Sequence, residues 1–391
     1  MTKQAIFMLS MSLLLLAASC KKDQNPIGTS DNTSENQAGA TGRAITPILP
    51  ATPFNYSTFA LPAYFNQPVI NGQNNTPTNN AITDNGATLG RVLFYDKSLS
   101  ANGTVACASC HQQAFSFSDP AKFSVGFAGG LTGRNSMSLL NSKYYPNGRF
   151  FWDERSATAE AQASRPIVNA VEMGMTMPAV VSKIQASTYY STLYQKAFGT
   201  TLIDSARTVR AIAQFVRSMV SYRTKYDTGR AAFPVNQNPG NVNFANFTAQ
   251  ENQGKQIFFG AGTCAACHGS ETFTASGPRN NGLDLVFTDN GVGAVTGNAQ
   301  QNGFFKVPSL RGIEKSAPYM HDGRFATLEQ VVEHYNSQIK PHVNLSPPLR
   351  GPNGQPRRLN LSAADKAALV AFLKTLTDTG IATDVKYSNP F

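Results

Sequence analysis

The chain has few of the residues that most often bind metals and cofactors: its 391 residues include five cysteines, five histidines and one tryptophan. Charged residues make up only 14%, and no run of alternating apolar residues predicts a β-strand. An apolar run over residues 11–17 is too short to cross a membrane as a helix. Lysine and arginine are scattered, without a tract, which argues against dedicated nucleic-acid binding. These absences favour an all-α protein whose chemistry depends on its few cysteines and histidines.

Four of the five cysteines fall in two copies of the pattern Cys-x-x-Cys-His, at residues 107–111 and 264–268. In this pattern the two thiols form thioether bonds to a porphyrin, and the histidine ligates the iron of a c-type haem. A single copy could arise by chance or belong to a zinc site. Two copies that use every cysteine but one predict a cytochrome with two covalently bound haem c groups. The predicted haem-binding residues are Cys107, Cys110, His111, Cys264, Cys267 and His268.

The first twenty residues are typical of an export signal, with Lys3 near the start, the apolar run, and small residues before Cys20. Cys20 resembles the lipid-modified first residue of a bacterial lipoprotein, and a plain secretory peptide is the alternative. Residues 21–50 are rich in Asn, Gly, Ser, Thr and Pro and predict a flexible tether. We therefore expect an exported, periplasmic protein that contacts the membrane only through a lipid anchor at Cys20.

A weak internal repeat precedes the two haem motifs, at residues 90–94 and 254–258. The second copy follows Thr248 and Glu251, which form a capping box that opens a helix. Apolar residues also recur at helical spacing over residues 209–220 and 369–376, and residues 233–246 read as a linker rich in Pro, Asn and Gly. We predict two cytochrome c-like domains with long irregular connections. They would span residues 51–235 and 236–391, and the C-terminal tail is free to pack back on the first domain.

The scarcity of histidine bears on the coordination of each iron. Residues 112–171 contain no histidine, so the N-terminal haem is expected to keep an open position that oxygen or peroxide can occupy. An open position favours catalysis over simple electron transfer. The residues that could close it instead are Met137, Met173 and Lys122.

Three residues downstream of the first haem motif suggest a peroxidase pocket. Gln162 lies ten residues after Trp152, and Glu172 lies twenty after it. Cleavage of a peroxide O–O bond needs a group that moves a proton from the near oxygen to the far one, and a buried carboxylate with a raised pKa suits that task. Each residue taken alone has a plainer interpretation: a surface carboxylate, a solvated glutamine and a core tryptophan.

These segments together resemble the bacterial di-haem cytochrome c peroxidases and their MauG-type relatives. The resemblance runs from about residue 90 to residue 372, through residues 90–96, both haem motifs, and residues 151–153, 307–311 and 317–323. It implies that the N-terminal haem is the peroxidatic one. It also implies that Gln162 and Glu172 line the distal pocket of this haem and that Trp152 relays electrons between the haems.

The resemblance further implies a calcium ion between the domains. The matching ligands are the side chain of Asn135 and the backbone carbonyls of Ser316 and Pro318. Oxygen donors of this kind suit Ca²⁺.

Two departures from typical peroxidases point toward the MauG-type branch. The loop at residues 120–131 lacks the distal histidine of typical members, which implies a permanently open first haem. Fourteen residues after His321, where typical members have a methionine ligand, the chain has Tyr335. Thr327 opens a helix whose apolar face includes the position of Tyr335 and turns His334 away. Tyr335 is thus the expected sixth ligand of the second haem, with Met320 or a plain core tyrosine as alternatives. A phenolate ligand would lower the haem potential, whereas a methionine would raise it.

We therefore expect a cytochrome-c peroxidase-like oxidoreductase that reduces hydrogen peroxide to water at the N-terminal haem. Electrons would arrive through the C-terminal haem from a small c-type cytochrome or copper protein. The formal net charge of +10 could steer an acidic partner, although a generally basic exported protein would carry it too. The alternatives are a MauG-type enzyme that oxidises residues of a partner protein and a non-enzymatic electron-transfer cytochrome. Members of the family are often dimers, which makes a homodimer a further expectation.

Overall fold

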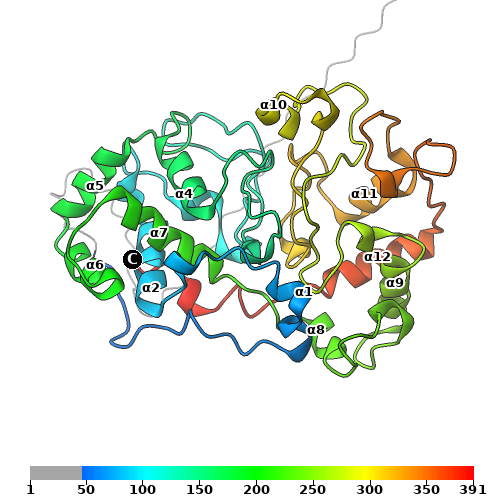
Figure 1. Ribbon diagram of the computed structural model, residues 1–391, viewed down its shortest axis with the longest axis horizontal. Helices are drawn as coiled ribbons and strands as arrows, with labels where there is room; N and C mark the ends of the chain where they lie inside the picture. The colour runs from blue at the N-terminus through cyan, green and yellow to red at the C-terminus, as the bar shows by residue number, and fades with distance from the viewer. Residues whose placement is uncertain (1–45) are drawn as a thin grey trace, which may run out of the picture. The chain divides into compact units, whose positions relative to one another are not determined.

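The computed structural model describes residues 46–391, and the expected signal peptide, Cys20 and most of the tether lie outside the described residues. The described residues contain helices joined by long irregular segments, and they form isolated β-bridges but no named strand (Figure 1). The predicted all-α class is therefore confirmed. No helix within residues 46–391 is long and apolar enough to cross a membrane. The α-helices are α1 (Pro68–Asn71), α2 (Asp84–Tyr95), α3 (Cys107–Cys110), α4 (Ala159–Val168), α5 (Met177–Ala186), α6 (Tyr190–Phe198), α7 (Ser205–Arg217), α8 (Lys225–Arg230), α9 (Ala249–Phe259), α10 (Val292–Thr296), α11 (Leu328–Glu333) and α12 (Ala363–Lys374).

The first core is built around the contact between α2 and α7, with α4, α5 and α6 packed beside them. Thr83 and Asp204 cap the two helices, because each side chain accepts a hydrogen bond from a backbone N–H of the first turn. The apolar stripe predicted over residues 209–220 is confirmed as part of α7, although the helix ends at Arg217. Buried members of this core include Leu89, Val92, Leu93, Phe94, Ile212, Phe215 and Val216.

The second core repeats this arrangement with α9 and α12. The capping box predicted at residues 248–251 is confirmed, as is the helix start expected at Thr327, which forms a capping box with Gln330. A third capping box joins Ser362 and Asp365. They start α9, α11 and α12, which bring the buried side chains of the second core together. Buried members of this core include Phe258, Leu328, Val332, Leu369, Phe372 and Leu373.

Each copy of the internal repeat places a glycine directly against the backbone of the partner helix. A Cβ on Gly90 of α2 would lie 2.0 Å from the carbonyl oxygen of Ala211 in α7. A Cβ on Gly254 of α9 would lie 1.9 Å from the carbonyl oxygen of Ala368 in α12. Only glycine fits at such a distance, because a real Cβ would overlap the backbone oxygen. The repeated glycine therefore sets the helix spacing upstream of each haem motif.

Gly254→Ala should accordingly lower the free energy of unfolding by about 1–3 kcal/mol, because α9 and α12 must move apart to admit the methyl group. Chemical denaturation of the holoprotein measures this loss. The matched control is Gly351→Ala, since a Cβ at Gly351 would lie 3.5 Å from its nearest neighbour, an ordinary van der Waals distance. The control should change stability by no more than about 0.5 kcal/mol. Equal effects of the two substitutions would contradict the role given to Gly254.

Residues just before and just after the predicted domain boundary are packed against other aromatic residues, which the sequence pattern did not predict. Tyr226 of α8, nine residues before residue 235, is buried in the second core. The predicted linker contributes Phe244, which stacks on Phe233 with 5.4 Å between ring centres. The boundary near residue 235 remains a prediction.

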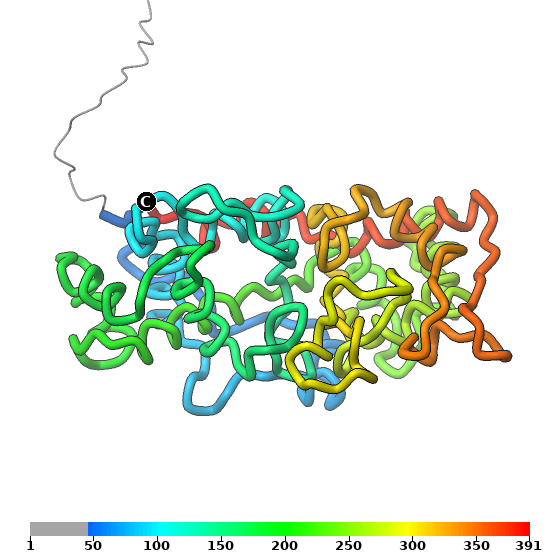
Figure 2. Tube along the Cα trace, turned by 90° about the horizontal axis from the view of Figure 1, so that it is seen from above, coloured from blue at the N-terminus to red at the C-terminus, as the bar shows by residue number. Residues whose placement is uncertain are grey.

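The C-terminal segment, residues 381–391, packs on the first core. Ile381 and Tyr387 belong to that core, and the Tyr387 hydroxyl donates to the carbonyl of Ser218 at 2.6 Å. Arg91 of α2 donates to the carbonyl of Ser388 at 2.6 Å. In the tube view, this red segment runs beside the blue and cyan segments of the first half (Figure 2). The segment thus crosses from the second core, where α12 ends, to the first.

A buried ion pair connects elements around the second haem motif. Arg311 donates two hydrogen bonds to the carboxylate of Asp227 in α8, at 2.8 and 2.9 Å, and its side chain is 0% exposed. The same guanidinium donates to the carbonyl of Glu271 at 2.6 Å. Tyr64 also donates to Asp227, at 2.9 Å. Although burial opposes it, the Arg311 guanidinium holds the pKa of Asp227 below its usual range.

Candidate active site with two cavities

The first Cys-x-x-Cys-His motif lies on the short helix α3, and its histidine is held in one orientation. His111 Nδ1 lies 2.9 Å from the carbonyl oxygen of Phe117, which makes Nδ1 the hydrogen donor and leaves Nε2 to bind a metal. Burial lowers the pKa of His111 and so favours the neutral imidazole that ligates iron. Within the described residues, neither Cys107 nor Cys110 takes part in a disulfide, so both sulfurs are available for thioether bonds. These features fit the covalent attachment of a haem.

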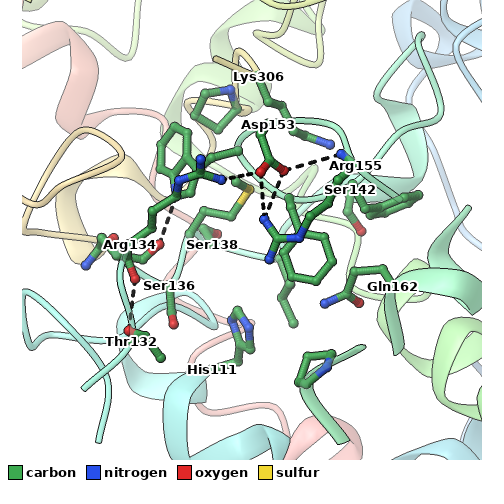
Figure 3. Close-up of a pocket in the computed structure, with 18 of the residues that line it drawn as sticks. His111, Thr132, Arg134, Ser136, Ser138, Ser142, Asp153, Arg155, Gln162 and Lys306 are labelled. Atoms are coloured by element: carbon green, nitrogen blue, oxygen red, sulfur yellow. Dashed lines mark hydrogen bonds and ion pairs between the residues drawn. The ribbon is translucent and has the colours of Figure 1, made fainter. Parts of the chain in front are cut away.

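A cavity of about 880 Å³ opens beside His111. His111, Trp152, Gln162 and Glu172 all line it, so the structure brings these sequence-predicted residues together. Figure 3 shows His111 and Gln162 projecting into this space from different elements. Of the three residues that could have closed the iron, Met137 lines the cavity, whereas Met173 and Lys122 do not.

Glu172 has the environment expected of a proton-transfer group. Burial raises the pKa of its carboxyl, and the nearby positive charge of Arg155 partly offsets that rise. Arg155 is itself held by Asp153, with both carboxylate oxygens 2.9 Å from its Nη1 atom. No hydrogen bond to the Glu172 carboxylate is present among residues 46–391. Its oxygens are therefore free to exchange a proton with a molecule in the cavity.

The loop without histidine is fastened to the loop that carries Glu172. The backbone N–H of Phe127 donates to the carbonyl of Glu172 at 2.9 Å. A Cβ on Gly126 would lie 1.7 Å from the carbonyl oxygen of Val171, so the two backbones touch. This contact fixes the position of the Glu172 backbone at the cavity wall.

The second haem motif lines a separate cavity of about 210 Å³. His268 Nδ1 lies 3.1 Å from the carbonyl oxygen of Phe273, and burial lowers the pKa of this histidine to about 4. Cys264 and Cys267 line the same cavity and, among residues 46–391, take part in no disulfide. As at the first motif, the chain presents two thiols and an unprotonated imidazole nitrogen to one space, which fits a second haem.

The expected sixth ligand, Tyr335, and its alternative, Met320, both lie at the second cavity. Tyr335 and Met320 each line it, and the Nδ2 atom of Asn281 lies 3.3 Å from the Tyr335 hydroxyl and 3.4 Å from the Met320 sulfur. Burial raises the pKa of Tyr335 to about 12. The chain around Tyr335 is not the regular α-helix expected, because α11 ends at Glu333 and residues 334–338 form a π-helical turn. Despite this change the hydroxyl of Tyr335 reaches the cavity.

The remaining histidines have other contacts. His334 is buried outside the cavity, with Nε2 3.0 Å from the carbonyl of Asn281, so it turns away as expected. His321 lines the second cavity and stacks on Phe305 with 3.7 Å between ring centres. His342 packs against Phe287.

Trp152 lines both cavities. Its indole N–H donates to the carbonyl of Asn135 at 2.8 Å, and its own carbonyl accepts from the N–H of Lys306 at 2.7 Å. Arg134, the neighbour of Asn135, forms ion pairs with Asp153 at 2.6 Å and Asp289 at 2.7 Å. These contacts hold the indole in the wall that the cavities share.

The residues expected to bind calcium lie at the second cavity. Asn135, Ser316 and Pro318 all line it. Asn135 Nδ2 donates to the carbonyls of Ala121 and Lys122, at 3.1 and 3.3 Å, which leaves its Oδ1 atom to accept a cation. Within residues 46–391, His, Cys, Asp and Glu side chains form no metal-binding group of three or more.

Four residues of the site were missed by sequence reasoning: Arg155, Lys306, Asn281 and Tyr145. Each lines one or both cavities. Arg155 follows Asp153 closely and could have been suspected from the Phe-Trp-Asp motif. The other three come from segments whose spacing to the haem motifs gives no signal.

Comparison with known proteins supports the same assignment. Residues 84–231 match the family described as "Di-haem cytochrome c peroxidase", and residues 252–377 match the family described as "Cytochrome c". "Methylamine utilization protein MauG" of Methylorubrum extorquens is 34% identical over 303 residues, which cover 77% of this chain and 80% of that protein. "Cytochrome c551 peroxidase" of Nitrosomonas europaea is 32% identical over 295 residues, which cover 74% and 79%.

A solved structure agrees with these relatives. The crystal structure of a MauG-like protein associated with microbial copper homeostasis superimposes with a TM-score of 0.73 at 30% identity, over 85% of this chain and 99% of that one. The expected pair of cytochrome c-like domains is thereby confirmed, and the non-enzymatic alternative loses its support because the relatives are oxidoreductases. The chain belongs to the family of di-haem cytochrome c peroxidases and MauG proteins, and it is an oxidoreductase with two c-type haems.

Proposed function

We propose that this protein reduces hydrogen peroxide to water in the cavity beside His111 (the N-terminal cavity). Electrons would be supplied through the cavity beside His268 (the C-terminal cavity). The observation that carries the proposal is that Glu172 and Gln162 line the same cavity as His111, with the pKa of Glu172 raised by burial. A bound haem supplies the iron that takes up peroxide and transfers electrons to it.

Three side chains around the cavity move the proton, orient the peroxide and stabilise the developing charge. The Glu172 carboxylate takes the proton from the near oxygen of peroxide and returns it to the far oxygen, so that water can leave. The amide of Gln162 donates a hydrogen bond that orients the peroxide. Arg155 adds positive charge, which favours the negative charge that develops as the O–O bond breaks.

Trp152 provides the route for electrons in this proposal, since its indole lines both cavities. Each peroxide needs two electrons and two protons to give two water molecules. A small c-type cytochrome or copper protein would deliver the electrons at the C-terminal haem. The net charge of +10 favours an acidic donor.

Steady-state turnover tests the proposal directly. The purified holoprotein should oxidise reduced cytochrome c only when peroxide is present. Its ferric spectrum should contain a high-spin component, because the iron held by His111 would keep an open position. Two low-spin haems that do not respond to peroxide would contradict the proposal.

A second candidate function is the MauG-type oxidation of residues in a partner protein. It is favoured by Tyr335 at the second cavity and by the absence of histidine from residues 120–131. Turnover with cytochrome c separates the two functions, because a MauG-type enzyme would consume peroxide with little oxidation of that donor.

The ligation of the second haem can be tested by exchanging its expected ligand. Tyr335→Met should raise the reduction potential of this haem by on the order of 0.1 V, because a thioether favours the ferrous state. Spectroelectrochemistry measures the change. Tyr319→Phe is the matched control, since Tyr319 lines the same cavity but donates to the carbonyl of Ile313 at 3.0 Å. If Tyr335→Met leaves both potentials unchanged, Tyr335 is not a ligand.

The setting of the reaction completes the proposal. We infer an exported protein in the periplasm, tethered by lipid at Cys20. We also infer a structural Ca²⁺ bound by the side chain of Asn135 and the carbonyls of Ser316 and Pro318.

A further inference from the structure

A buried tyrosine–carboxylate pair lies at the wall of the N-terminal cavity. Tyr145 lines the cavity and donates its hydroxyl proton to Oε1 of Glu154, and the two residues are 2% and 4% exposed. Asn147 donates to the other oxygen of Glu154 at 2.6 Å. The carboxylate therefore stays aimed at the phenol.

Among the tyrosines of residues 46–391, it is unusual both to line one of the two cavities and to donate to a carboxylate. Other tyrosines with a carboxylate partner line neither of the two cavities; these are Tyr64, Tyr189, Tyr190 and Tyr226. The two tyrosines at the second cavity have no carboxylate partner, since Tyr319 donates to a backbone carbonyl and Tyr335 contacts the Asn281 amide. Tyr145 is the described tyrosine that meets both conditions.

The backbone of Glu154 is in a strained conformation. Glu154 has φ = 57°, in the left-handed region that residues other than glycine rarely adopt. Arg149 holds this conformation by donating to the carbonyl of Glu154 at 3.0 Å. In this strained conformation the carboxylate lies next to the Tyr145 hydroxyl. A proton acceptor at that position assists oxidation of the ring.

The chemistry of a buried phenol explains why the acceptor matters. Loss of an electron alone would leave a positive charge in a region with little solvent, which is unfavourable. When the hydroxyl proton moves to a hydrogen-bonded base at the same time, the product is a neutral radical. Glu154 is the base that the geometry provides for Tyr145.

Lys306 makes this oxidation harder. Its Nζ atom lies 3.6 Å from the centre of the Tyr145 ring and donates to the carbonyl of Arg149 at 2.8 Å. A positive charge over the ring opposes the removal of an electron from it. Burial lowers the pKa of Lys306 to about 7, so its positive charge weakens as the pH rises through that value. While the charge is present, Tyr145 should give up an electron only after more easily oxidised groups have done so.

We propose that Tyr145 is a redox-active residue that supplies an electron to the N-terminal haem site when peroxide arrives and no external donor is present. The inference rests on the proposed peroxidase function. The electron leaves the phenol ring, the proton moves from the hydroxyl to Oε1 of Glu154, and Tyr145 becomes a neutral phenoxyl radical. Peroxide is the oxidant: it takes one electron from Tyr145, a second from the iron of the haem pair and two protons from solvent, and it gives two molecules of water.

Electron paramagnetic resonance on the holoprotein tests the inference. Samples are mixed with hydrogen peroxide without a donor and frozen within milliseconds. Wild-type protein should show a tyrosyl radical that narrows when ring-deuterated tyrosine is incorporated, and Tyr145→Phe should abolish it. The matched control is Tyr190→Phe, which removes a buried tyrosine bonded to Asp96 away from both cavities and should keep the signal. A tyrosyl radical that persists in Tyr145→Phe would overturn the inference.

Two further variants test the roles of the neighbours. Glu154→Gln removes the proton acceptor and should greatly lower the radical yield. Lys306→Met removes the charge over the ring and should raise it. An unchanged yield in Glu154→Gln, or a lower yield in Lys306→Met, would contradict the mechanism. The narrowing with ring-deuterated tyrosine is measured on wild-type protein and needs no variant. A signal that keeps its width would place the radical on a residue other than tyrosine and overturn the proposal.

The absorption spectrum recorded in the same experiment separates this inference from the proposed function. If peroxide is consumed and the haem spectrum changes while no radical forms on Tyr145, the peroxidase function stands and the inference fails. If peroxide causes no spectral change, both fail.

Discussion

Replacing Glu172 with glutamine should slow peroxide consumption by roughly 10²- to 10⁴-fold, the usual contribution of a positioned proton-transfer group. Glutamine keeps the size of the side chain but cannot take and return a proton. Both haems should stay attached, because the cysteines and histidines of the two motifs are untouched. Stopped-flow absorption at increasing peroxide concentration measures the rate.

A matched control and a pH profile make this prediction specific. Glu329→Gln carries the same change on an exposed carboxylate of α11 and should leave the rate unchanged. Because burial raises the pKa of Glu172 above the ordinary 4.5, the carboxyl becomes protonated, and therefore unable to accept a proton, at a higher pH than usual. The wild-type rate should fall on the acid side through that raised pKa, and Glu172→Gln should lack this dependence. Wild-type kinetics in Glu172→Gln would remove Glu172 from the mechanism.

Arg311→Ala should lower the free energy of unfolding by about 3–5 kcal/mol, the effect of leaving one partner of a buried ion pair without its counter-charge. Asp227 would remain buried with no guanidinium beside it, and the carbonyl of Glu271 would lose its donor. Because Glu271 immediately precedes the loop that carries Phe273, the carbonyl partner of His268, the spectrum of the second haem should change as well.

The control for Arg311 is an ion pair of similar length but greater exposure. Lys225 and Glu251 are 2.7 Å apart, and the Lys225 side chain is 42% exposed. Lys225→Met should cost no more than about 1 kcal/mol, because water screens such a pair. Urea denaturation of both variants measures the two losses. A loss below about 1 kcal/mol in Arg311→Ala would show that the buried pair does not stabilise this junction.

The parts of this structure that were predictable from the sequence are those fixed by local chemistry. The haem motifs depend on covalent spacing, and the capping boxes at Thr248, Thr327 and Ser362 depend on hydrogen bonds within three residues. The internal repeat was recognisable, although the reason for it, the contact of Gly90 and Gly254 with a neighbouring helix, required the structure.

Features that depend on tertiary contacts were not predictable in the same way. The π-helical turn at Tyr335 breaks the regular periodicity from which its direction was inferred, because tertiary contacts override local propensity there. Asn281 meets Tyr335 from 54 residues away, and Lys306 reaches the backbone of Arg149 from 157 residues away. Neither distance leaves a pattern in the sequence. The role of Glu172 was inferred from family resemblance, and the structure adds the burial that shifts its pKa.

The C-terminal segment has a consequence for how the protein matures. Gln113, two residues after His111, donates through its side-chain amide to the carbonyls of Ile381 and Asp384, both at 2.9 Å. Ile381 is synthesised 268 residues later than Gln113. The surroundings of the first motif are therefore complete only once the last part of the chain has folded against it.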